Sequence, residues 1–595
     1  MALSTVLTVL YVAIYTRVAQ ADNVAAPINV PFNLTHFFGY DGPWQAIPVL
    51  VSDPQQLIHL YPGGTYATCI PSVNVGNYES NYTSENFPTK AGIFDLALAQ
   101  PALHGSSQNY YIVGPANGGT IGPVDGSLNG GRPSNLTGEG LMISDSLSWG
   151  GIPTVSNVSI SAIYNATYTL HNGTTYPLDV GFVSLGASNN QFFGDSDGTI
   201  LYTANMVPLN LSATGKIPSN AWGMHIGSVY PIVKPSLILG GYDRSRVIGD
   251  VSTWSTQIVT TSDMIINLLD VSIGVETGAP PFPSFSKSGL LMDAGQVVDT
   301  LTVRPNPTVP YLYLPGDSCK AITSQLPVTY IQSLDLYSWN VTSPDYQNIV
   351  SSPSYLAFTF QVHESSDNMT IKVPFALLNL TLTPPLMDDP TQYFPCKSYS
   401  PQGPNSQSGN EYHLGRAFLQ AAFIGMNWNQ DIWWMAQAPG PYRLPVPDTI
   451  TILNSTTELQ PGGNSSAWAA SWSNILKPLC IHGESVSSNC ASSDTGLSTS
   501  AKAGIGIGAA FGALILLASI FFLFQHRKKQ RCLAGKGTST RQELDGKSTY
   551  FGRQSPKSTA VSPGQISELP VEERSELGSS ELFSSDQTTQ TTHTT

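Results

Sequence analysis

Short apolar runs separated by turn-forming residues dominate the chain from about residue 30 to residue 441. Representative runs cover residues 46–51, 110–113, 158–164, 236–239 and 355–362. Gly, Pro, Asn and Ser recur between these runs, and the runs have the length of strands rather than of helices. The pattern therefore predicts a mainly β body with few and short helices, and it argues against alternating β and α units.

A different pattern follows the β-rich body. Residues 445–502 are rich in Ser, Asn, Gly and Pro, yet Trp468, Trp472 and Leu476 recur every four residues. That spacing predicts a short helix packed on the body, whereas the alternative is a glycosylated stalk. Residues 525–595 are rich in Ser and Thr and hold few large apolar residues, which predicts a disordered tail.

Two apolar segments predict how the chain is targeted. Residues 2–15 are largely apolar and residues 19–21 form an A-x-A cleavage site, so residues 1–21 are typical of a secretory signal peptide. The alternative for this segment is a short buried helix. Residues 503–524 carry no charge and, as a helix, would span about 30 Å. A basic cluster at residues 527–531 follows at once, which orients the tail toward the cytoplasm.

These segments together predict a single-pass type I protein of the plasma membrane or cell surface, reached by the secretory pathway. Its C-terminal tail would be cytoplasmic. Gly504, Gly508 and Gly512 lie four apart, on one face of the predicted transmembrane helix. Such spacing permits two helices to approach closely and is compatible with a homodimer. The alternative is the ordinary glycine content of membrane helices.

Charge is unevenly distributed along the 595 residues. The formal net charge is −14 and only 11% of residues are charged. Residues 22–500 hold 14 basic and 32 acidic residues, while the segment from residue 525 holds 10 basic and 8 acidic ones. This asymmetry is expected if the two parts of the chain lie in different compartments, on opposite sides of a membrane. An acidic outer part also argues against a nucleic-acid partner, because such a protein needs a basic face.

Asparagines in N-x-S/T sequons occur only on the predicted outer side, as expected of a secreted glycoprotein domain. They are Asn33, Asn81, Asn135, Asn157, Asn165, Asn172, Asn210, Asn340, Asn368, Asn379, Asn454 and Asn464.

Six cysteines lie at positions 69, 319, 396, 480, 490 and 532. Cys532 follows the predicted span on its cytoplasmic side, so an odd number remains outside. Cys480 with Cys490 is the local pairing and Cys69 with either of them is the long-range one, and these alternatives stay open. Because the sequence contains no C-x-x-C and no local pair of metal-binding histidines, we expect neither a metal site nor a cofactor.

Residues 194–198 match the G-x-S-x-G pattern of a serine nucleophile. Such a nucleophile sits between a strand and a following helix, but residues 199–202 have the pattern of a strand. Two aspartates flank the serine and would disfavour an oxyanion. We therefore interpret this segment as an acidic surface turn.

Several segments of the outer part resemble the pepsin-like aspartic peptidases. Residues 235–250 contain an L-x-x-G-G-x-D core similar to the inter-lobe signature of that family. Residues 412–420 resemble its late I-L-G-x-x-F-L-R segment, and residues 179–186 its D-G-I-L-G-L segment. Further matches, in family order over about 400 residues, are residues 44–56 before the first catalytic loop, 217–228, 422–429 and 432–438.

The resemblance implies a bilobal pepsin-like fold with a central cleft. The ectodomain would cover residues 22–444, with an N-terminal lobe at about 40–230 and a C-terminal lobe at about 231–440. The family commonly carries one disulfide in its second lobe, which implies a Cys319–Cys396 pair. Together with the predicted membrane anchor, the resemblance is to fungal membrane-anchored homologues.

Peptide hydrolysis in this family uses one aspartate from each lobe, and the two carboxyls share a proton. Aligned on its flanks, the first aspartate position falls on Pro62 or Gly63. Counting back from Pro315 places the second at Asn306. Pro and Gly carry no ionisable group, and an Asn amide cannot act as the general base.

Asp293 is the alternative second aspartate, because it lies in a D-x-G triplet. It would still lack a partner in the first lobe, and such triplets are common by chance in a Gly-rich chain. The family's flap tyrosine cannot be assigned with certainty. Tyr110 or Tyr111 could take that position, although an ordinary strand tyrosine is the alternative.

The sequence thus predicts a pseudoenzyme, a cell-surface glycoprotein whose pepsin-like domain binds or senses a ligand in the cleft. That ligand would be a peptide or a cell-wall polymer. The main alternative is an active membrane-anchored aspartic endopeptidase that cleaves peptides at acidic pH. A third alternative is a structural wall glycoprotein with no ligand.

Overall fold

The computed structural model describes residues 25–63, 68–74, 91–99, 136–170, 172–194, 200–256, 264–362, 368–401 and 411–480. The chain divides into two units, Met1–Gly496 and Leu497–Thr595, and every described residue lies in the first. The predicted signal peptide, transmembrane segment and tail lie outside the described residues, as do Tyr110 and Tyr111. Among the residues that are described, no helix is both long and apolar enough to cross a membrane.

The described part of the chain is mainly β, as the sequence predicts. The first eight-stranded sheet has the order β5-β4-β9-β3-β2-β6-β7-β8. Side chains of β2 are alternately fully buried and half-buried, as a period of two residues requires. The strands are β2 (Ile47–Val51), β3 (Gln56–Pro62), β4 (Thr68–Val73), β5 (Phe94–Asp95), β6 (Leu136–Trp149), β7 (Val155–Thr169), β8 (Thr175–Pro177) and β9 (Phe182–Val183).

A second eight-stranded sheet follows later in the chain, with the order β25-β24-β16-β20-β29-β21-β28 and β17 paired to β16. Its strands are β16 (Ile266–Val275), β17 (Ser286–Lys287), β20 (Leu301–Pro305), β21 (Leu312–Leu314), β24 (Ser354–Gln361), β25 (Asn368–Pro374), β28 (Cys396–Ser398) and β29 (Tyr412–Leu414).

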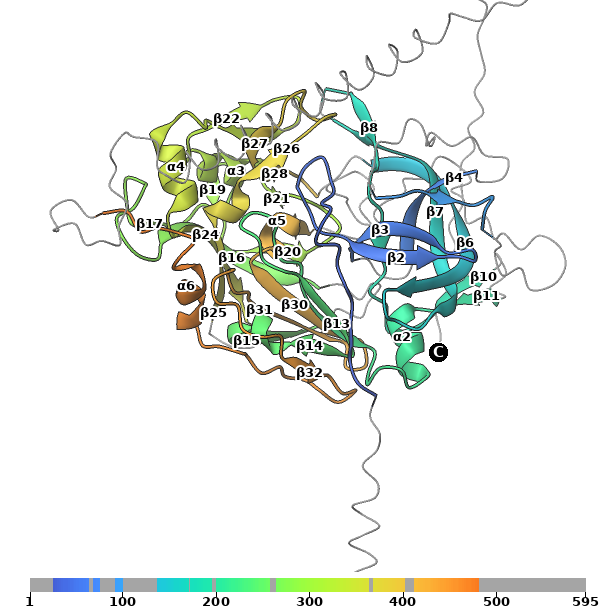
Figure 1. Cartoon of the computed structure of the whole chain (residues 1–595). Helices are drawn as coiled ribbons and strands as arrows, with labels where there is room; N and C mark the ends of the chain where they lie inside the picture. The colour runs from blue at the N-terminus through green and yellow to red at the C-terminus, as the bar shows by residue number, and fades with distance from the viewer. Residues whose placement is uncertain are drawn as a thin grey trace, which may run out of the picture. The chain divides into compact units, whose positions relative to one another are not determined.

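A six-stranded sheet joins segments that are far apart in the sequence. Its order is β1-β13-β12-β30-β31-β15, so β12 pairs with β30 from near the end of the described chain. Figure 1 shows β13, β15, β30 and β31 of this sheet. The strands are β1 (Ile28–Asn29), β12 (Ala221–His225), β13 (Ser236–Leu239), β15 (Ile248–Ser255), β30 (Ala422–Asn427) and β31 (Ile432–Gln437).

The remaining elements are short. A four-stranded sheet contains β22 (Val328–Ile331), β23 (Leu336–Trp339), β27 (Thr391–Phe394) and β26 (Leu380–Leu382). The two-stranded pairs are β10 (Gln191–Gly194) with β11 (Ile200–Ala204), β14 (Gly241–Asp243) with β32 (Thr449–Thr451), and β18 (Met292–Asp293) with β19 (Gln296–Val297). The helices are α2 (Val207–Ala213), α3 (Gly316–Thr323), α4 (Pro344–Ser351), α5 (Arg416–Leu419), α6 (Ser466–Trp472), and the 3₁₀ turns η1 (Arg244–Arg246) and η2 (Phe375–Leu378).

One strand arrangement occurs in both eight-stranded sheets. In the first, β3 runs parallel to β9, and β4 pairs antiparallel with the same β9. In the second, β20 runs parallel to β29, and β21 pairs antiparallel with the same β29. A central strand flanked by one parallel and one antiparallel neighbour is thus formed twice, by residues from the two halves of the body.

The L-x-x-G-G-x-D segment forms β13, β14 and η1. The carboxylate of Asp243 accepts hydrogen bonds from the backbone N–H groups of Ser245 and Asp448, at 3.0 and 2.9 Å. It also lies 3.1 Å from the Nε of Arg246, and both charged side chains are buried. A buried charge is costly unless it is paired and hydrogen-bonded, so this aspartate stabilises the fold instead of offering a free carboxylate.

Cys319 of α3 and Cys396 of β28 form the disulfide that the resemblance implied, with their Cα atoms 5.7 Å apart. This prediction is confirmed. Cys480 is also disulfide-bonded, and Cys69 is buried in β4. Cys490 and Cys532 lie outside the described residues, so the remaining pairing stays a prediction.

The segment after the β-rich body contains α6, on which Trp468 and Trp472 both lie. These tryptophans and Leu476 are 4%, 3% and 2% exposed. Trp468 meets the ring of Tyr355 edge to face, with ring centroids 5.8 Å apart. This stretch therefore packs on the body through the residues that recur every four positions.

Candidate functional site

Gly63 and Asn306 occupy equivalent positions in the two eight-stranded sheets. Each follows the last residue of a strand that runs parallel to a partner, β3 with β9 and β20 with β29. The backbone N–H of Gly63 donates to the carbonyl of Val183, at 3.1 Å, and that of Asn306 donates to the carbonyl of Leu414, at 2.9 Å. Of the two residues suggested for the first position, Gly63 and not Pro62 is the structural counterpart of Asn306.

The two equivalent positions meet through their loops. Gly63 has φ of +136°, and a Cβ atom added to it would lie 2.7 Å from Cγ of Pro307 and 3.0 Å from Cγ2 of Thr308. A side chain at this position would therefore need a strained backbone and a displaced Pro307. The packing excludes a carboxylate from the first position as the loop now stands.

The side chain of Asn306 is buried, with 8% of the residue exposed. Its Oδ1 accepts hydrogen bonds from the backbone N–H of Thr308, at 3.0 Å, and from its Oγ1, at 2.6 Å. Its Nδ2 lies 3.2 Å from Nδ1 of His413. These bonds hold the amide in one orientation, but an amide has no group that ionises near neutral pH and so cannot act as an acid or a base there.

Arg416, the first residue of α5, joins the loop after β20 to the end of β3. Its guanidinium donates to the carbonyls of Pro307 and Thr308, each at 3.1 Å. The same group lies over the rings of Tyr61 and Trp44, with its Cζ 4.1 and 5.0 Å from their centroids. Because Tyr61 lies on β3 and Pro307 follows β20, this one buried cation contacts segments from both sheets.

Two carboxyls share the charge environment of Arg416. Asp41 lies 3.8 Å from the guanidinium and accepts a hydrogen bond from Nε1 of Trp44, at 2.7 Å. Burial raises the pKa of Asp41, while Arg416 and that hydrogen bond oppose the rise. Burial, and then the charge of Asp41, raise the pKa of Asp179 to about 7. Asp179 is therefore a carboxyl that changes charge near neutral pH.

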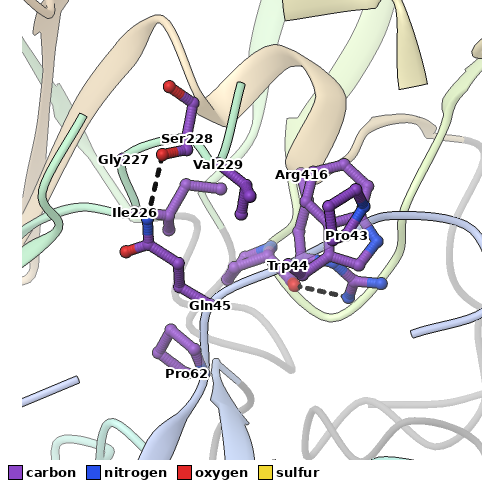
Figure 2. Close-up of a pocket in the computed structure, with 10 residues that line it drawn as sticks. Pro43, Trp44, Gln45, Pro62, Ile226, Gly227, Ser228, Val229 and Arg416 are labelled. Carbon is purple, nitrogen blue, oxygen red and sulfur yellow. Dashed lines mark hydrogen bonds between the residues drawn. The ribbon is translucent and has the colours of Figure 1, made fainter. Parts of the chain in front are cut away.

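A pocket of only about 10 Å³ lies where these segments meet (Figure 2). It is lined by residues 43–45, 62, 226–229, 307 and 416. Nε2 of Gln45 donates to the carbonyl of Ser228 at 2.9 Å, as Figure 2 shows. A space of this size holds about one water molecule.

Asp293 lies elsewhere, in the exposed β18–β19 ribbon. Its carboxylate accepts a hydrogen bond from the backbone N–H of Ala294, at 2.9 Å. Among the described residues it forms no hydrogen bond or ion pair with Gly63, Asn306 or Arg416. The structure thus brings the two counted positions together, and the described contacts of Asp293 include neither of them.

Arg416, Asp41 and Asp179 were not identified as site residues from the sequence. Arg416 and Asp179 lie in segments that carry the family resemblance, but there they mark the fold. For Asp179, the available sequence signal was an aspartate at the start of an otherwise apolar stretch, residues 178–185. Its charge partners lie far away in the sequence, so only the folded chain reveals the cluster.

The described residues contain no group of three or more His, Cys, Asp or Glu side chains that could hold a metal ion. The G-x-S-x-G match begins at the end of β10, and residues 195–199 lie outside the described residues. Five sequon asparagines with described side chains are exposed, namely Asn172, Asn340, Asn368, Asn454 and Asn464.

Comparisons with known proteins find similarity among solved structures. No family model and no curated protein matches the chain. Among solved structures, the aspartic proteinase from Irpex lacteus is similar, with a TM-score of 0.41 and 14% sequence identity. The alignment covers 69% of this chain and 98% of that protein.

Proposed function

We propose that this chain is a pepsin-like cell-surface glycoprotein whose cleft binds a ligand without hydrolysing it. The observation that carries the proposal is the chemistry of the two equivalent positions. Gly63 offers no side chain and Asn306 offers an amide. Acid–base hydrolysis of a peptide needs a carboxyl at each position, one as base and one as acid.

The repeated strand arrangement supports a pepsin-like body with two lobes. Each eight-stranded sheet contributes one loop to the same meeting point, as a cleft between related lobes would require. The sequence segments that resemble the family flank these loops in family order. Neither observation depends on whether the domain is catalytic.

The packing around Gly63 supports loss of catalysis rather than a misplaced loop. An aspartate there would collide with Pro307, whose carbonyl accepts a hydrogen bond from Arg416. Restoring a carboxyl pair would therefore require several coordinated changes. A buried cation in contact with Tyr61 of β3 and with the loop after β20 favours a rigid scaffold for binding.

The rest of the proposal concerns where the domain works. A cleaved signal peptide at residues 1–21 and a transmembrane helix at residues 503–524 would anchor it in the plasma membrane, with residues 525–595 in the cytoplasm. The ligand would be an extracellular peptide or a cell-wall polymer. The three transmembrane glycines would support a homodimer.

A peptide library incubated with purified protein between about pH 3 and pH 6, the range where aspartic dyads act, tests the proposal. We expect no cleavage and no activity sensitive to pepstatin. Cleavage that disappears in Asp293→Ala or Asp179→Asn would establish the alternative, an active endopeptidase. Binding to a peptide array or to insoluble wall polysaccharide would support a cleft ligand, whereas failure on both would favour the structural wall glycoprotein.

A further inference from the structure

A second pocket lies away from the two loops, beside α6. Its volume is about 360 Å³, within the size range of small-ligand sites. Its walls come from β15, β25 and α6, and they include Asp250, Asn368, Thr370, Lys372 and Trp468. β15 is an edge strand of the six-stranded sheet, and β25 is an edge strand of the second eight-stranded sheet. The pocket thus lies between two sheet edges.

We propose that this pocket binds the first sugar of an N-linked glycan attached to Asn368. The glycan would come from a lipid-diphosphate-linked oligosaccharide. Nδ2 of Asn368 forms a bond to C1 of the first sugar, the bond from C1 to the diphosphate oxygen breaks, and one amide proton is lost. The inference rests on the secretory route in the proposed function.

The outward face of β25 supports this occupant. Residues 369, 371 and 373 are buried, whereas Asn368 and Thr370 are exposed and Lys372 is half-buried. Asn368 and Thr370 are the two recognised residues of one sequon, so the acceptor amide stands at the pocket's rim. Alternate residues of a strand lie about 7 Å apart along it, so a sugar on Asn368 would extend over Thr370 toward Lys372.

The charges of the pocket favour a neutral hydroxylated ligand. The ammonium of Lys372 is already paired with Glu276, at 2.6 Å, and lies 4.9 and 5.0 Å from the ring centroids of Tyr355 and Trp468. Its charge is therefore compensated. The carboxylate of Asp250 is exposed on the opposite wall, where it would repel an anion but accept hydrogen bonds from sugar hydroxyls.

The walls are also rigid enough to hold a ring. Oε1 of Gln437 accepts from the backbone N–H of Lys372, at 2.7 Å, and its Nε2 donates to the carbonyls of Lys372 and Ala421. The indole of Trp468 is 4% exposed, and its Nε1–H has no partner among the described residues. That nitrogen is enclosed by protein atoms, so a sugar in the pocket would pack against the indole ring and not bond to its N–H.

A glycan seated here would shield two sheet edges. Edge strands present unpaired backbone groups, and covering them suppresses association between chains. The inference therefore also assigns a role to the sugar, since loss of the Asn368 glycan would expose both edges.

The test uses the full chain produced in a glycosylating eukaryotic cell, treated with peptide-N-glycosidase in the native state. Asn340, an exposed sequon asparagine outside the pocket, is the internal control. We expect the Asn368 glycan to be released at least about tenfold more slowly than the Asn340 glycan, which corresponds to about 1.4 kcal/mol. After denaturation the two rates should agree.

Two variants sharpen the result. Trp468→Phe should bring native release at Asn368 close to that at Asn340. Trp472 lies on the same helix and is about as buried as Trp468, but it does not line the pocket. The control variant Trp472→Phe should therefore leave the release rate at Asn368 unchanged. A glycan on Asn340 with none on Asn368, or equal native rates at both, overturns this inference alone. Glycans absent from every sequon would instead contradict the secretory route.

Discussion

The ends of β3 and β20 share one backbone register but differ in chemistry. Both are followed by a residue whose N–H donates to the parallel partner strand, yet one is Gly63 and the other is Asn306. At the first, packing against Pro307 leaves no room for a side chain; at the second, a polar side chain is held by Thr308. The comparison teaches that strand pairing and Arg416 maintain this geometry without any carboxyl pair.

Gly63→Asp should have the largest effect. The new Cβ would collide with Pro307 and the backbone would be strained, so we expect a loss of about 4 kcal/mol in the free energy of unfolding. Urea titration of the purified protein measures it. Gly151→Asp is the matched control, because Gly151 has φ of +84° with nothing within 4 Å, and it should cost clearly less. Equal costs would mean that the Pro307 contact is unimportant.

Arg416→Met should cause the second largest loss of stability. It removes two hydrogen bonds to the loop after Asn306 and leaves Asp41 without its cation, at a cost of about 3 kcal/mol. Arg244→Met is the control, since the Arg244–Asp448 pair is exposed and should contribute no more than about 1 kcal/mol. Urea titration measures the free energy of unfolding of both variants. Similar losses in the two would show that the contacts of Arg416 with the two sheets contribute no special stability.

The third prediction concerns pH. The pKa of Asp179 is about 7 in the folded chain against 3.8 for the free side chain, so the folded state holds this proton more tightly. Its contribution to stability is fully present below about pH 4 and is lost as the pH rises toward about 7. The unfolding free energy should fall by about 3 kcal/mol more in the wild type than in Asp179→Asn across this window.

The urea midpoint measured at several pH values checks this expectation. Asp41→Asn removes the negative charge that helps raise the pKa of Asp179, so the upper end of the window should move to lower pH. A pH dependence that is unchanged in Asp179→Asn would show that other groups control stability in this range.

Asn306→Asp should have the smallest effect. The carboxylate can still accept both hydrogen bonds from Thr308, so we expect stability to change by no more than about 1 kcal/mol. The variant should remain unable to cleave peptides at acidic pH, because Gly63 supplies no partner. Cleavage by this variant in a quenched-fluorescence peptide assay would mean that another carboxyl completes the pair.

The sequence predicted much of the fold from local patterns. Runs at residues 46–51, 236–239 and 355–362 lie in or coincide with β2, β13 and β24, because strand length and turn residues are local properties. The spacing of Trp468 and Trp472 likewise corresponds to α6. The Cys319–Cys396 disulfide followed from the resemblance, since spacing alone leaves cysteine pairing open.

The site could be predicted only in part. Counting from flanking motifs reached Pro62 or Gly63 and Asn306, but choosing between the first two required the hydrogen bond to Val183. The cluster of Arg416, Asp41 and Asp179 could not be predicted, because its members come from distant segments. A pKa depends on burial and on neighbouring charges, and both exist only after folding.

By itself, the sequence determined the mainly β character of the body, the absence of an aspartate at the two counted positions, and the sequon at Asn368. These are properties of residue identity and local order. Only the tertiary structure decided that Gly63 meets Pro307, that one buried arginine contacts segments of both sheets, and that Asn368 stands beside a pocket between two sheet edges. Such features depend on contacts between strands far apart in the chain, where close packing, not sequence distance, determines which atoms meet.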